Sequence, residues 1–422
     1  MNVLGIAILV LGGMTMAAQQ RPPAITDEAK VPVYTLPDPL RCADGTVVTD
    51  RETWRTKRRP ELLKLFEQEE YGKALLGRPK AMKFVIRDEK HDARGGRATR
   101  FRVGILFEGT ESGRQMELLV YLPNKVKKAP VFLGLNFDGN YACTDDADIP
   151  VPTHWVNGIF KNKPTNNKPP AEARGIHKEL WQIDMALDNG FGVAMVAYGE
   201  IEPDANDSWK VGPRGLAKEP GKGDWGQLAT YAWALRRAMD YLQTNPRVDS
   251  KRVALTGFSR LGKAALWACA QDERFALVVS NESGAGGAAL HKRIFGETTA
   301  DLNRVFARWF CGNFVKYAGN EADMPYDQHE LIALIAPRPV LIISADKDLW
   351  SDPKGEFLSG VGADRVYRLV SGEGISQKEW PAAQKLIESR IGYYLRPGPH
   401  DVTAEDWRAM ITYAQKYLKS KR

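Results

Sequence analysis

Ser259 occupies a position from which a hydroxyl group can act as a nucleophile. It follows an apolar run at 253–258 and precedes a segment of helical character at 260–267. A buried strand, a tight turn and a helix form the nucleophile elbow of serine hydrolases, which exposes a serine at the carboxyl edge of an α/β sheet. The alternative is a plain strand-to-helix turn in which the Ser259 hydroxyl only caps the helix. The local pattern favours the nucleophile.

The turn departs from the usual G-x-S-x-G pattern. Leu261 occupies the place of the second glycine, Gly262 follows one residue later, and Arg260 and Lys263 put two cations beside the serine. The backbone N–H of Arg260 is the expected donor to an oxyanion, and its guanidinium could reach the same charge. Loss of such a donor costs roughly 3–4 kcal/mol. The alternative for Arg260 is a surface ion pair with a nearby acid.

His400 is the strongest candidate for a general base among the six histidines. A Gly-Pro pair fixes the backbone before it, and a helix with a capping box at Thr403 and Asp406 follows it. Serine, acid and then histidine is the chain order that α/β hydrolases use. The other histidines lie in charged, polar or helix-start segments: His91, His154, His177, His291 and His329.

Two acids compete to orient the imidazole of His400. Glu282 follows an apolar strand at 275–280, and Asp348 follows another at 338–344. Either carboxylate could stabilise the charged imidazole. Asp346 is a less favoured neighbour. The sequence leaves the choice between Glu282 and Asp348 open, so both belong to the candidate site.

Alternating strands and helices must position these residues. Helical spacing appears at 60–72, 180–188, 225–243 and from Thr403 onward, and apolar runs that predict strands lie at 98–107, 116–122, 129–136, 191–198, 253–258, 275–280 and 338–344. The alternation predicts an α/β-hydrolase fold, a three-layer αβα sandwich with a mostly parallel central sheet. Ligands bind outside the carboxyl ends of such strands. A polar segment at 144–170 is expected to form a surface loop near that edge.

The chain divides into three parts. Residues 1–18 resemble a secretory signal peptide that ends in small residues, although a short N-terminal membrane anchor is the alternative. That apolar run is shorter than the roughly 20 residues of a membrane span. Residues 19–95 are expected to wrap over the catalytic domain, and 96–422 to form it. We therefore expect a secreted or periplasmic protein with no membrane segment after cleavage.

Composition and cysteine spacing exclude several other classes. The net charge of +7 is scattered, with no basic stripe interleaved with aromatic residues, so no nucleic-acid partner is expected. The cysteines lack a C-x-x-C pair, which argues against zinc and iron–sulfur sites. An exported chain could form one or two disulfides, although Cys269 and Cys311 could also be buried thiols; the four are Cys42, Cys143, Cys269 and Cys311. Ester hydrolysis by serine, histidine and an acid needs no cofactor and no metal.

Four motifs together resemble the glucuronoyl esterases of carbohydrate esterase family 15, in their bacterial form. They are G-F-S-R-L-G-K at 257–263, N-E-S-G-A-G-G at 281–287, D-L-W at 348–350 and P-H-D-V-T at 399–403. The similarity extends from about residue 95 to the C-terminus. Members of this family hydrolyse esters between 4-O-methyl-glucuronoyl side chains of glucuronoxylan and lignin alcohols, so a lignin-carbohydrate ester is the implied substrate.

The resemblance also implies roles for single residues. Ser259 would be the nucleophile, His400 the base and Arg260 the stabiliser of the oxyanion. Glu282 matches the acid of fungal members, and Asp348 matches the acid of many bacterial members. The residues that hold the hydroxyl groups of the uronic acid ring are matched by Lys263, Glu297 and Trp350.

Two positions differ from the family pattern. Phe258 replaces the cysteine that fungal members have before the serine, and Asp138 lies in a strand end where a more glycine-rich loop is expected. Two other functions remain open. One is a different carbohydrate esterase, such as a xylan deacetylase or a broad carboxylesterase. The other is a non-catalytic carbohydrate-binding relative. We expect a monomer in either case.

Overall fold

A nine-stranded sheet forms the centre of the protein. The computed structural model describes residues 23–156, 159–160 and 163–418, so the expected signal peptide lies outside the described residues. The strand order is β1-β2-β3-β7-β4-β8-β9-β10-β11. In chain order the strands are β1 (Lys83–Asp92), β2 (Ala98–Leu106), β3 (Gln115–Pro123), β4 (Ala129–Asn136), β7 (Gly192–Ala197), β8 (Val248–Phe258), β9 (Leu277–Asn281), β10 (Val340–Ala345) and β11 (Ile391–Arg396).

Most of the sheet is parallel, as predicted. The strands from β7 to β11 in the sheet order run in the same direction. At the other edge, β1, β2 and β3 pair antiparallel with one another, and β3 pairs antiparallel with β7. A separate two-stranded hairpin, β5 (Ile159–Phe160) with β6 (Lys163–Pro164), lies within the long polar segment.

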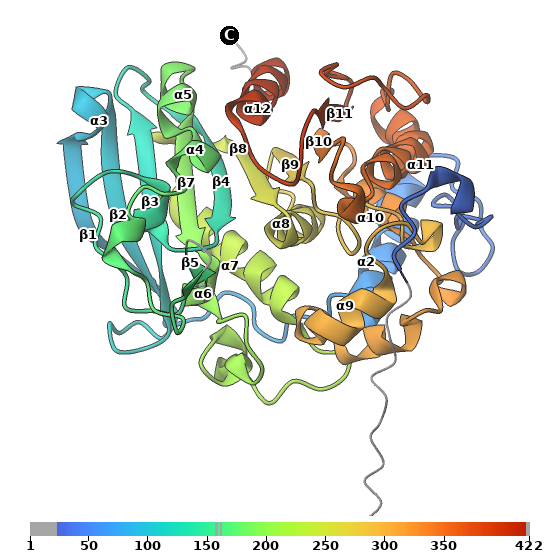
Figure 1. Ribbon diagram of the computed structural model, residues 1–422, viewed down its shortest axis with the longest axis horizontal. Coiled ribbons are helices and arrows are strands. Elements are labelled where there is room, and N and C mark those ends of the chain that lie inside the picture. Colours follow the sequence, from blue (N-terminus) through green and yellow to red (C-terminus); the bar gives the residue numbers. More distant parts are fainter. Residues whose placement is uncertain (1–22, 157–158, 161–162, 419–422) are drawn as a thin grey trace, which may run out of the picture.

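Helices cover both faces of the sheet (Figure 1). On one face α7, α8 and α11 pack against the strands, α10 packs on α8 and α11, and α2 packs on α10. The other face packs against α5 and α12. Figure 1 shows these two groups on opposite sides of the strands. The helices are α1 (Arg51–Thr53), α2 (Arg59–Glu69), α3 (Ala93–Gly96), α4 (Lys178–Trp181), α5 (Ile183–Asp188), α6 (Tyr198–Ile201), α7 (Gln227–Leu242), α8 (Arg260–Gln271), α9 (Thr299–Phe306), α10 (Gln328–Ile335), α11 (Pro353–Ser371) and α12 (Ala404–Tyr417).

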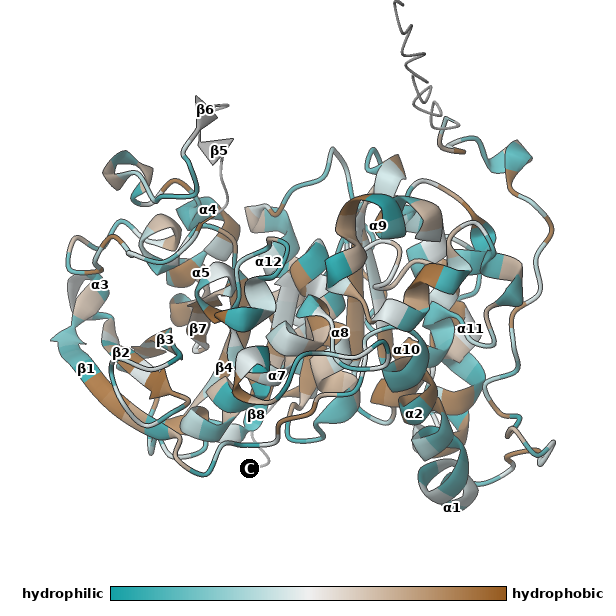
Figure 2. Cartoon of the chain, turned by 90° about the horizontal axis from the view of Figure 1, so that it is seen from below, coloured by the Kyte–Doolittle hydropathy of each residue, from teal (hydrophilic) through white to brown (hydrophobic). Residues whose placement is uncertain are grey.

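Strand β4 shows why two cores form. Its side chains alternate, so Val131 and Leu133 enter the core under α7 and α8, while Phe132 enters the core under α5 and α12. A strand that is buried on both faces is expected to be apolar throughout, and every residue of β4 is buried. Figure 2 shows hydrophobic colour on the central strands and hydrophilic colour on many of the surrounding loops. This is the three-layer arrangement expected from the sequence.

The segment before residue 96 contacts the rest of the chain at several places, including the sheet and the helices α8 and α10. Its strand β1 pairs with β2 and extends the sheet. Upstream of β1, the buried guanidinium of Arg58 lies 2.7 Å from the carboxylate of Glu330 on α10, and Arg59 donates to the backbone oxygen of Ala270 at the end of α8. None of the helices in the described part of the chain combines the length and apolarity that a bilayer span requires.

The four cysteines form no disulfide. Cys42, Cys143, Cys269 and Cys311 are all free and buried. The expectation of one or two disulfides is therefore wrong, and the alternative of buried thiols holds for Cys269 and Cys311. A thiol in an apolar interior behaves as a small hydrophobic side chain. Burial raises the pKa of Cys269 and of Cys143, which keeps both as neutral thiols.

Candidate active site

Ser259 lies on a strained turn between β8 and α8. Its φ of 54° and ψ of −132° are unfavourable for a residue with a side chain. Backbone hydrogen bonds hold the turn. The Ser259 N–H donates to the backbone oxygen of Asn281 at 2.9 Å, and the backbone oxygen of Ser259 accepts from the Gly262 N–H at 2.9 Å. The Ser259 side chain makes no capping hydrogen bond to α8. The capping alternative is therefore wrong, and the conformation is that of a nucleophile elbow.

The displaced glycine of the elbow has a steric explanation. A Cβ on Gly262 would lie 2.9 Å from the Gly257 oxygen and 3.0 Å from the Ser283 side chain. A Cβ on Gly257 would lie 2.3 Å from the Leu261 oxygen. The first turn of α8 thus passes against the end of β8 and the loop after β9, and this approach requires glycine at both positions. Leu261 points into the core instead, where it is buried.

His400 lies beside the elbow. Its imidazole packs on the ring of Phe258, with centroids 4.4 Å apart and planes 31° apart. Phe258 precedes Ser259, so this contact ties the loop of His400 to the turn of Ser259. Phe258, which differs from the cysteine of the fungal pattern, therefore links the two loops by packing.

Both candidate acids reach the same nitrogen of His400. Nδ1 lies 2.6 Å from an Asp348 oxygen and 3.0 Å from a Glu282 oxygen. Glu282 follows β9, Asp348 follows β10 and His400 follows β11, so three adjacent parallel strands deliver the cluster to one edge. With Nδ1 occupied by the two carboxylates, Nε2 is the nitrogen free to receive a proton from a nucleophile.

Arg396 fixes this arrangement from behind. Its buried guanidinium donates to Glu282 at 2.8 Å and to the backbone oxygens of Pro399 and Asp401 at 2.7 and 2.9 Å. It also lies 3.0 Å from the Asp406 carboxylate on α12. One side chain therefore holds an acid and both sides of the His400 loop. The sequence did not single out Arg396, although its place at the end of an apolar strand four residues before His400 is a usable signal.

The electrostatics of the cluster favour a charged pair. Burial opposes a positive charge on His400, but the hydrogen bonds to Asp348 and Glu282 outweigh it and raise the pKa of the imidazole to about 9. Burial also opposes ionisation of Asp348, yet the bond to His400 lowers the pKa of this carboxyl below its ordinary value. For Glu282 burial prevails and raises the pKa, although His400 and Arg396 oppose it. Asp348 is thus the more readily ionised of the two acids.

The same three side chains also form a possible metal donor set. Ligand atoms of Glu282, Asp348 and His400 all lie within 4.8 Å of one another. However, the separations of 2.6 and 3.0 Å from Nδ1 to the carboxylate oxygens are those of hydrogen bonds with a shared proton. The hydrogen bonds account for the cluster without an ion.

Arg260 is held rigidly at the start of α8. Its guanidinium pairs with the buried carboxylate of Asp204 and lies 4.6 Å from the centroid of the Trp309 ring. The same carboxylate accepts from Arg308 at 2.6 Å and from the indole of Trp309 at 3.0 Å. The ion pair of the alternative interpretation therefore exists, but it orients Arg260 next to the elbow rather than on a distant surface. Sequence reasoning assigned no role to Asp204 or Trp309.

The predicted sugar-binding residues converge beside the elbow. Lys263 is 3% exposed, and its ammonium group donates to the Ala285 oxygen and to Glu297 at 3.3 Å. The Glu297 N–H donates to the Trp350 oxygen at 2.8 Å, which joins the loop after β9 to the loop after β10. Trp350 is 39% exposed. An ammonium group from the first turn of α8 and a carboxylate are thus paired, and the backbone of Trp350 is tied to the same segment.

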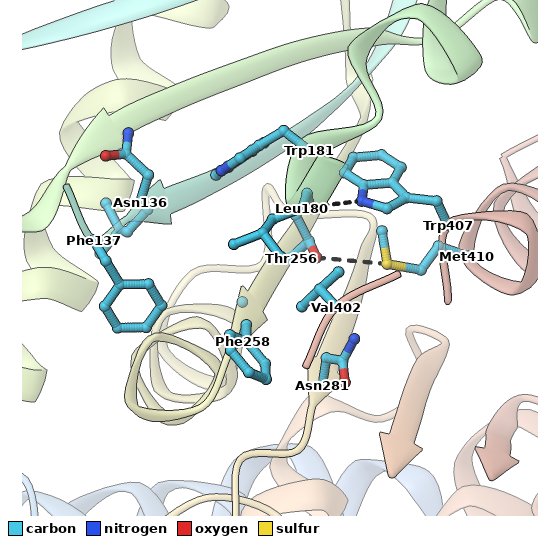
Figure 3. A pocket seen from close by; sticks show the side chains of 12 residues that line it. Asn136, Phe137, Leu180, Trp181, Thr256, Phe258, Asn281, Val402, Trp407 and Met410 are labelled. Atoms are coloured by element: carbon cyan, nitrogen blue, oxygen red, sulfur yellow. Dashed lines mark hydrogen bonds between the residues drawn. The ribbon is translucent and has the colours of Figure 1, made fainter. Parts of the chain in front are cut away.

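A small apolar cavity lies beside the end of β8 (Figure 3). Its volume is about 40 Å³, and aromatic residues such as Phe137, Phe258 and Trp407 line it. Figure 3 shows Asn281 lining this cavity together with Val402 and Phe258. Within the described residues, both amide atoms of Asn281 are buried without a hydrogen-bond partner.

The loop after β4 differs from the expected glycine-rich form. Asn136, the last residue of β4, donates to the Asn140 side chain at 2.8 Å and accepts from the Gly139 N–H at 2.9 Å. Asp138 lies 2.9 Å from Nδ1 of His177. The carboxylate of Asp138 thus lies against an imidazole within this wall of the site.

Known proteins resemble this chain over nearly its whole length. A family model described as "Glucuronyl esterase, fungi" matches residues 219–371. Carbohydrate esterase MZ0003, from an unknown prokaryotic organism, is 48% identical over 398 residues, which are 93% of this chain and 91% of that protein. A promiscuous CE15 esterase from a marine bacterial metagenome has a TM-score of 0.88 at 47% identity and covers 94% of this chain and 100% of its own.

A second solved structure agrees with the first. The glucuronoyl esterase from Solibacter usitatus has a TM-score of 0.87 at 42% identity and covers 93% of this chain and 100% of its own. The fold and these relatives define an enzyme of the α/β-hydrolase fold, a carboxylic ester hydrolase. The chain belongs to the glucuronoyl esterases, carbohydrate esterase family 15. The resemblance stated from the sequence is therefore confirmed.

Proposed function

We propose that the protein hydrolyses esters between (4-O-methyl-)glucuronoyl side chains of glucuronoxylan and lignin alcohols, through an acyl-enzyme on Ser259. The observation that carries this proposal is that a histidine–acid cluster and a buried lysine–glutamate pair both adjoin the turn of Ser259. On one side His400 is held by Glu282 and Asp348. On the other side the buried Lys263–Glu297 pair lies next to the serine turn.

The reaction follows from the positions of the protons. Nε2 of His400 accepts the proton of the Ser259 hydroxyl as its oxygen attacks the ester carbonyl. The resulting oxyanion is stabilised by the N–H and the guanidinium of Arg260. The imidazolium returns its proton to the departing alcohol, which leaves the glucuronoyl group on Ser259. A water molecule, activated by His400, then releases the acid and restores the serine.

Lys263, Glu297 and Trp350 are suited to hold the uronic acid. An ammonium group has three donors, and Lys263 directs two of them to Ala285 and Glu297. The third can donate to a ring hydroxyl, and the Glu297 carboxylate can accept from another. The partly exposed indole of Trp350 offers an apolar face for the sugar ring.

The test compares Ser259→Ala with the unchanged protein on benzyl glucuronate. We expect hydrolysis to disappear in the variant while binding of glucuronate, measured by calorimetry, persists. A variant that still hydrolyses the ester would exclude Ser259 as nucleophile. Glu273→Gln, on the exposed surface, is the matched control. If Ser259→Ala changed no measurable property, the non-catalytic carbohydrate-binding alternative would be favoured.

A broader esterase is the second candidate. One observation favours it, because the relative at 47% identity is described as promiscuous. Rates on benzyl glucuronate and on an aryl acetate separate the two functions. A preference for the acetate would count against the uronate ester as natural substrate.

The remaining expectations belong to the same proposal. A glucuronoyl esterase that acts on plant cell walls must reach an insoluble polymer, so we propose that residues 1–18 direct export and that the mature enzyme is secreted or periplasmic. We propose a monomer in which 19–95 packs on a catalytic domain at 96–422. Mass spectrometry of the exported protein and its mass in solution test these points.

A further inference from the structure

Glu356 is a buried acid beside the candidate catalytic cluster that the mechanism above does not use. It lies in the first turn of α11, and its side chain is fully buried. No lysine, arginine or histidine of the described residues forms an ion pair with it. Burying a carboxyl group without a cation is costly unless the group is hydrogen-bonded or neutral.

The hydrogen bonds of Glu356 reach both segments that carry the acids of His400. Oε1 accepts from the Gly284 N–H at 2.9 Å and from the Ser283 hydroxyl at 3.3 Å, directly after Glu282. Oε2 lies 2.6 Å from the Ser344 hydroxyl, on β10 and four residues before Asp348. A single side chain thus bridges the loop of one acid and the strand of the other.

The charges around Glu356 favour its neutral form. Burial raises the pKa of this carboxyl to about 8, although the bonds from Ser344 and Gly284 oppose the shift, and the carboxylates of Asp348 and Glu282 raise it further. The hydroxyl of Tyr393 on β11 also faces the group. Asp352, at the start of α11, is paired with Arg293. A charged Glu356 would therefore be a third negative group beside two that hold His400.

We propose that Glu356 is a positioning residue that acts as a neutral carboxyl group and holds Glu282 and Asp348 in place around His400. In this form Oε1 accepts two hydrogen bonds and the protonated Oε2 donates to Ser344. The inference rests on the proposed function, because it assigns Glu356 to the support of the candidate acids.

Two substitutions at Glu356 distinguish a role in positioning the two acids from a role in filling space in the core. Glu356→Gln keeps the shape, the acceptor and a donor without a titrating proton, and we expect its kcat to stay within about threefold of the unchanged enzyme. Glu356→Leu keeps the volume but removes the bridge. We expect it to lower kcat on benzyl glucuronate by about tenfold or more with little change in KM, and to shift the acid limb of the pH profile that His400 governs. Unchanged kcat and pH profile in Glu356→Leu would overturn the proposal, as would an equal loss in both variants.

The neutral state has a readout that needs no substrate. A carboxyl whose pKa is 4.5 in the unfolded chain and about 8 in the folded protein binds its proton more tightly when folded, so stability falls as pH rises between these values. As the pH rises from 5 to 8, we expect the unfolding midpoint of the unchanged protein to decrease more than that of Glu356→Gln. Parallel midpoints would overturn the neutral state.

The kinetic and the stability comparisons distinguish failure of this inference from failure of the proposed function. Failure of the unchanged enzyme on benzyl glucuronate, with activity on another ester, would exclude the proposed substrate. The Glu356 comparison would then be made with that other ester. The stability comparison is independent of any substrate.

Discussion

The double contact at Nδ1 of His400 predicts that neither acid is essential alone. We consider Asp348→Asn, Glu282→Gln and the double variant. The shift of the His400 pKa from 6.5 to about 9 corresponds to about 3.4 kcal/mol of favourable interaction with the imidazolium, at 1.36 kcal/mol per unit. Because the His400 side chain is 39% exposed, solvent screening reduces this figure, and we take about 2 kcal/mol for the two carboxylates together.

Removal of one carboxylate should therefore raise the activation barrier by about 1 kcal/mol, which is about fivefold in kcat. The remaining carboxylate still accepts the Nδ1 proton and holds the tautomer. Removal of both leaves Nδ1 beside two amides, which can donate as well as accept and therefore no longer fix the tautomer. Loss of tautomer control in a triad costs up to about 10⁴-fold. The double variant should thus lose at least about 10³-fold, far more than the product of the two single losses.

The assay is kcat and kcat/KM on benzyl glucuronate from pH 5 to pH 10. The base acts only when neutral, so kcat/KM rises with pH through the His400 pKa. Loss of a negative neighbour lowers this pKa, and each single variant should show its rise at lower pH than the unchanged enzyme. Asp346→Asn is the control, because this carboxylate accepts from the Gly398 N–H at 2.8 Å and is not a partner of His400. Two results would refute a role shared by Glu282 and Asp348. One is a 10⁴-fold loss of kcat in a single variant, and the other is a loss in the double variant that equals the product of the two single losses.

Two other residues give further predictions. Arg260→Lys should lower kcat by about 10²-fold, because a lysine cannot keep both the pair with Asp204 and the contact with the Trp309 ring. The control Arg308→Lys should lower kcat much less. Equal losses of kcat in the two variants would exclude Arg260 as the stabiliser of the oxyanion. Glu297→Gln should raise KM for benzyl glucuronate about tenfold and leave KM for an aryl acetate unchanged, so a matching rise on both esters would exclude a role in sugar binding.

The sheet and the elbow could be predicted because their signals are local and strong. The buried strand β4 is apolar, as is the predicted part of β8 at 253–258, although β8 begins earlier with a polar stretch. The capping box of α12 forms as predicted at Thr403 and Asp406. Other elements gave weak patterns. Strand β1 is a half-exposed edge strand rich in charge, and α11 contains several glycines, which lower helix propensity.

The choice between the two acids could not be made from the sequence for a geometric reason. Parallel strands bring Glu282 and Asp348 to the same edge, but the reach of each side chain depends on backbone angles that residue types do not reveal. Glu282 has a φ of 47°, a conformation that residues with side chains rarely adopt. Its orientation also depends on Arg396, a partner 114 residues away. In the structure both carboxylates lie within hydrogen-bonding distance of Nδ1 of His400.

The strained backbone at Ser259 bears on how this protein can be stabilised. Holding a non-glycine residue at such angles costs about 1–3 kcal/mol, a noticeable part of the 5–15 kcal/mol by which folded proteins exceed their unfolded state. Glycine would adopt the same angles without that penalty. A search for thermostable variants that measures only stability is therefore expected to accept glycine at this position, whereas under the proposed mechanism a search that also measures turnover would keep the serine.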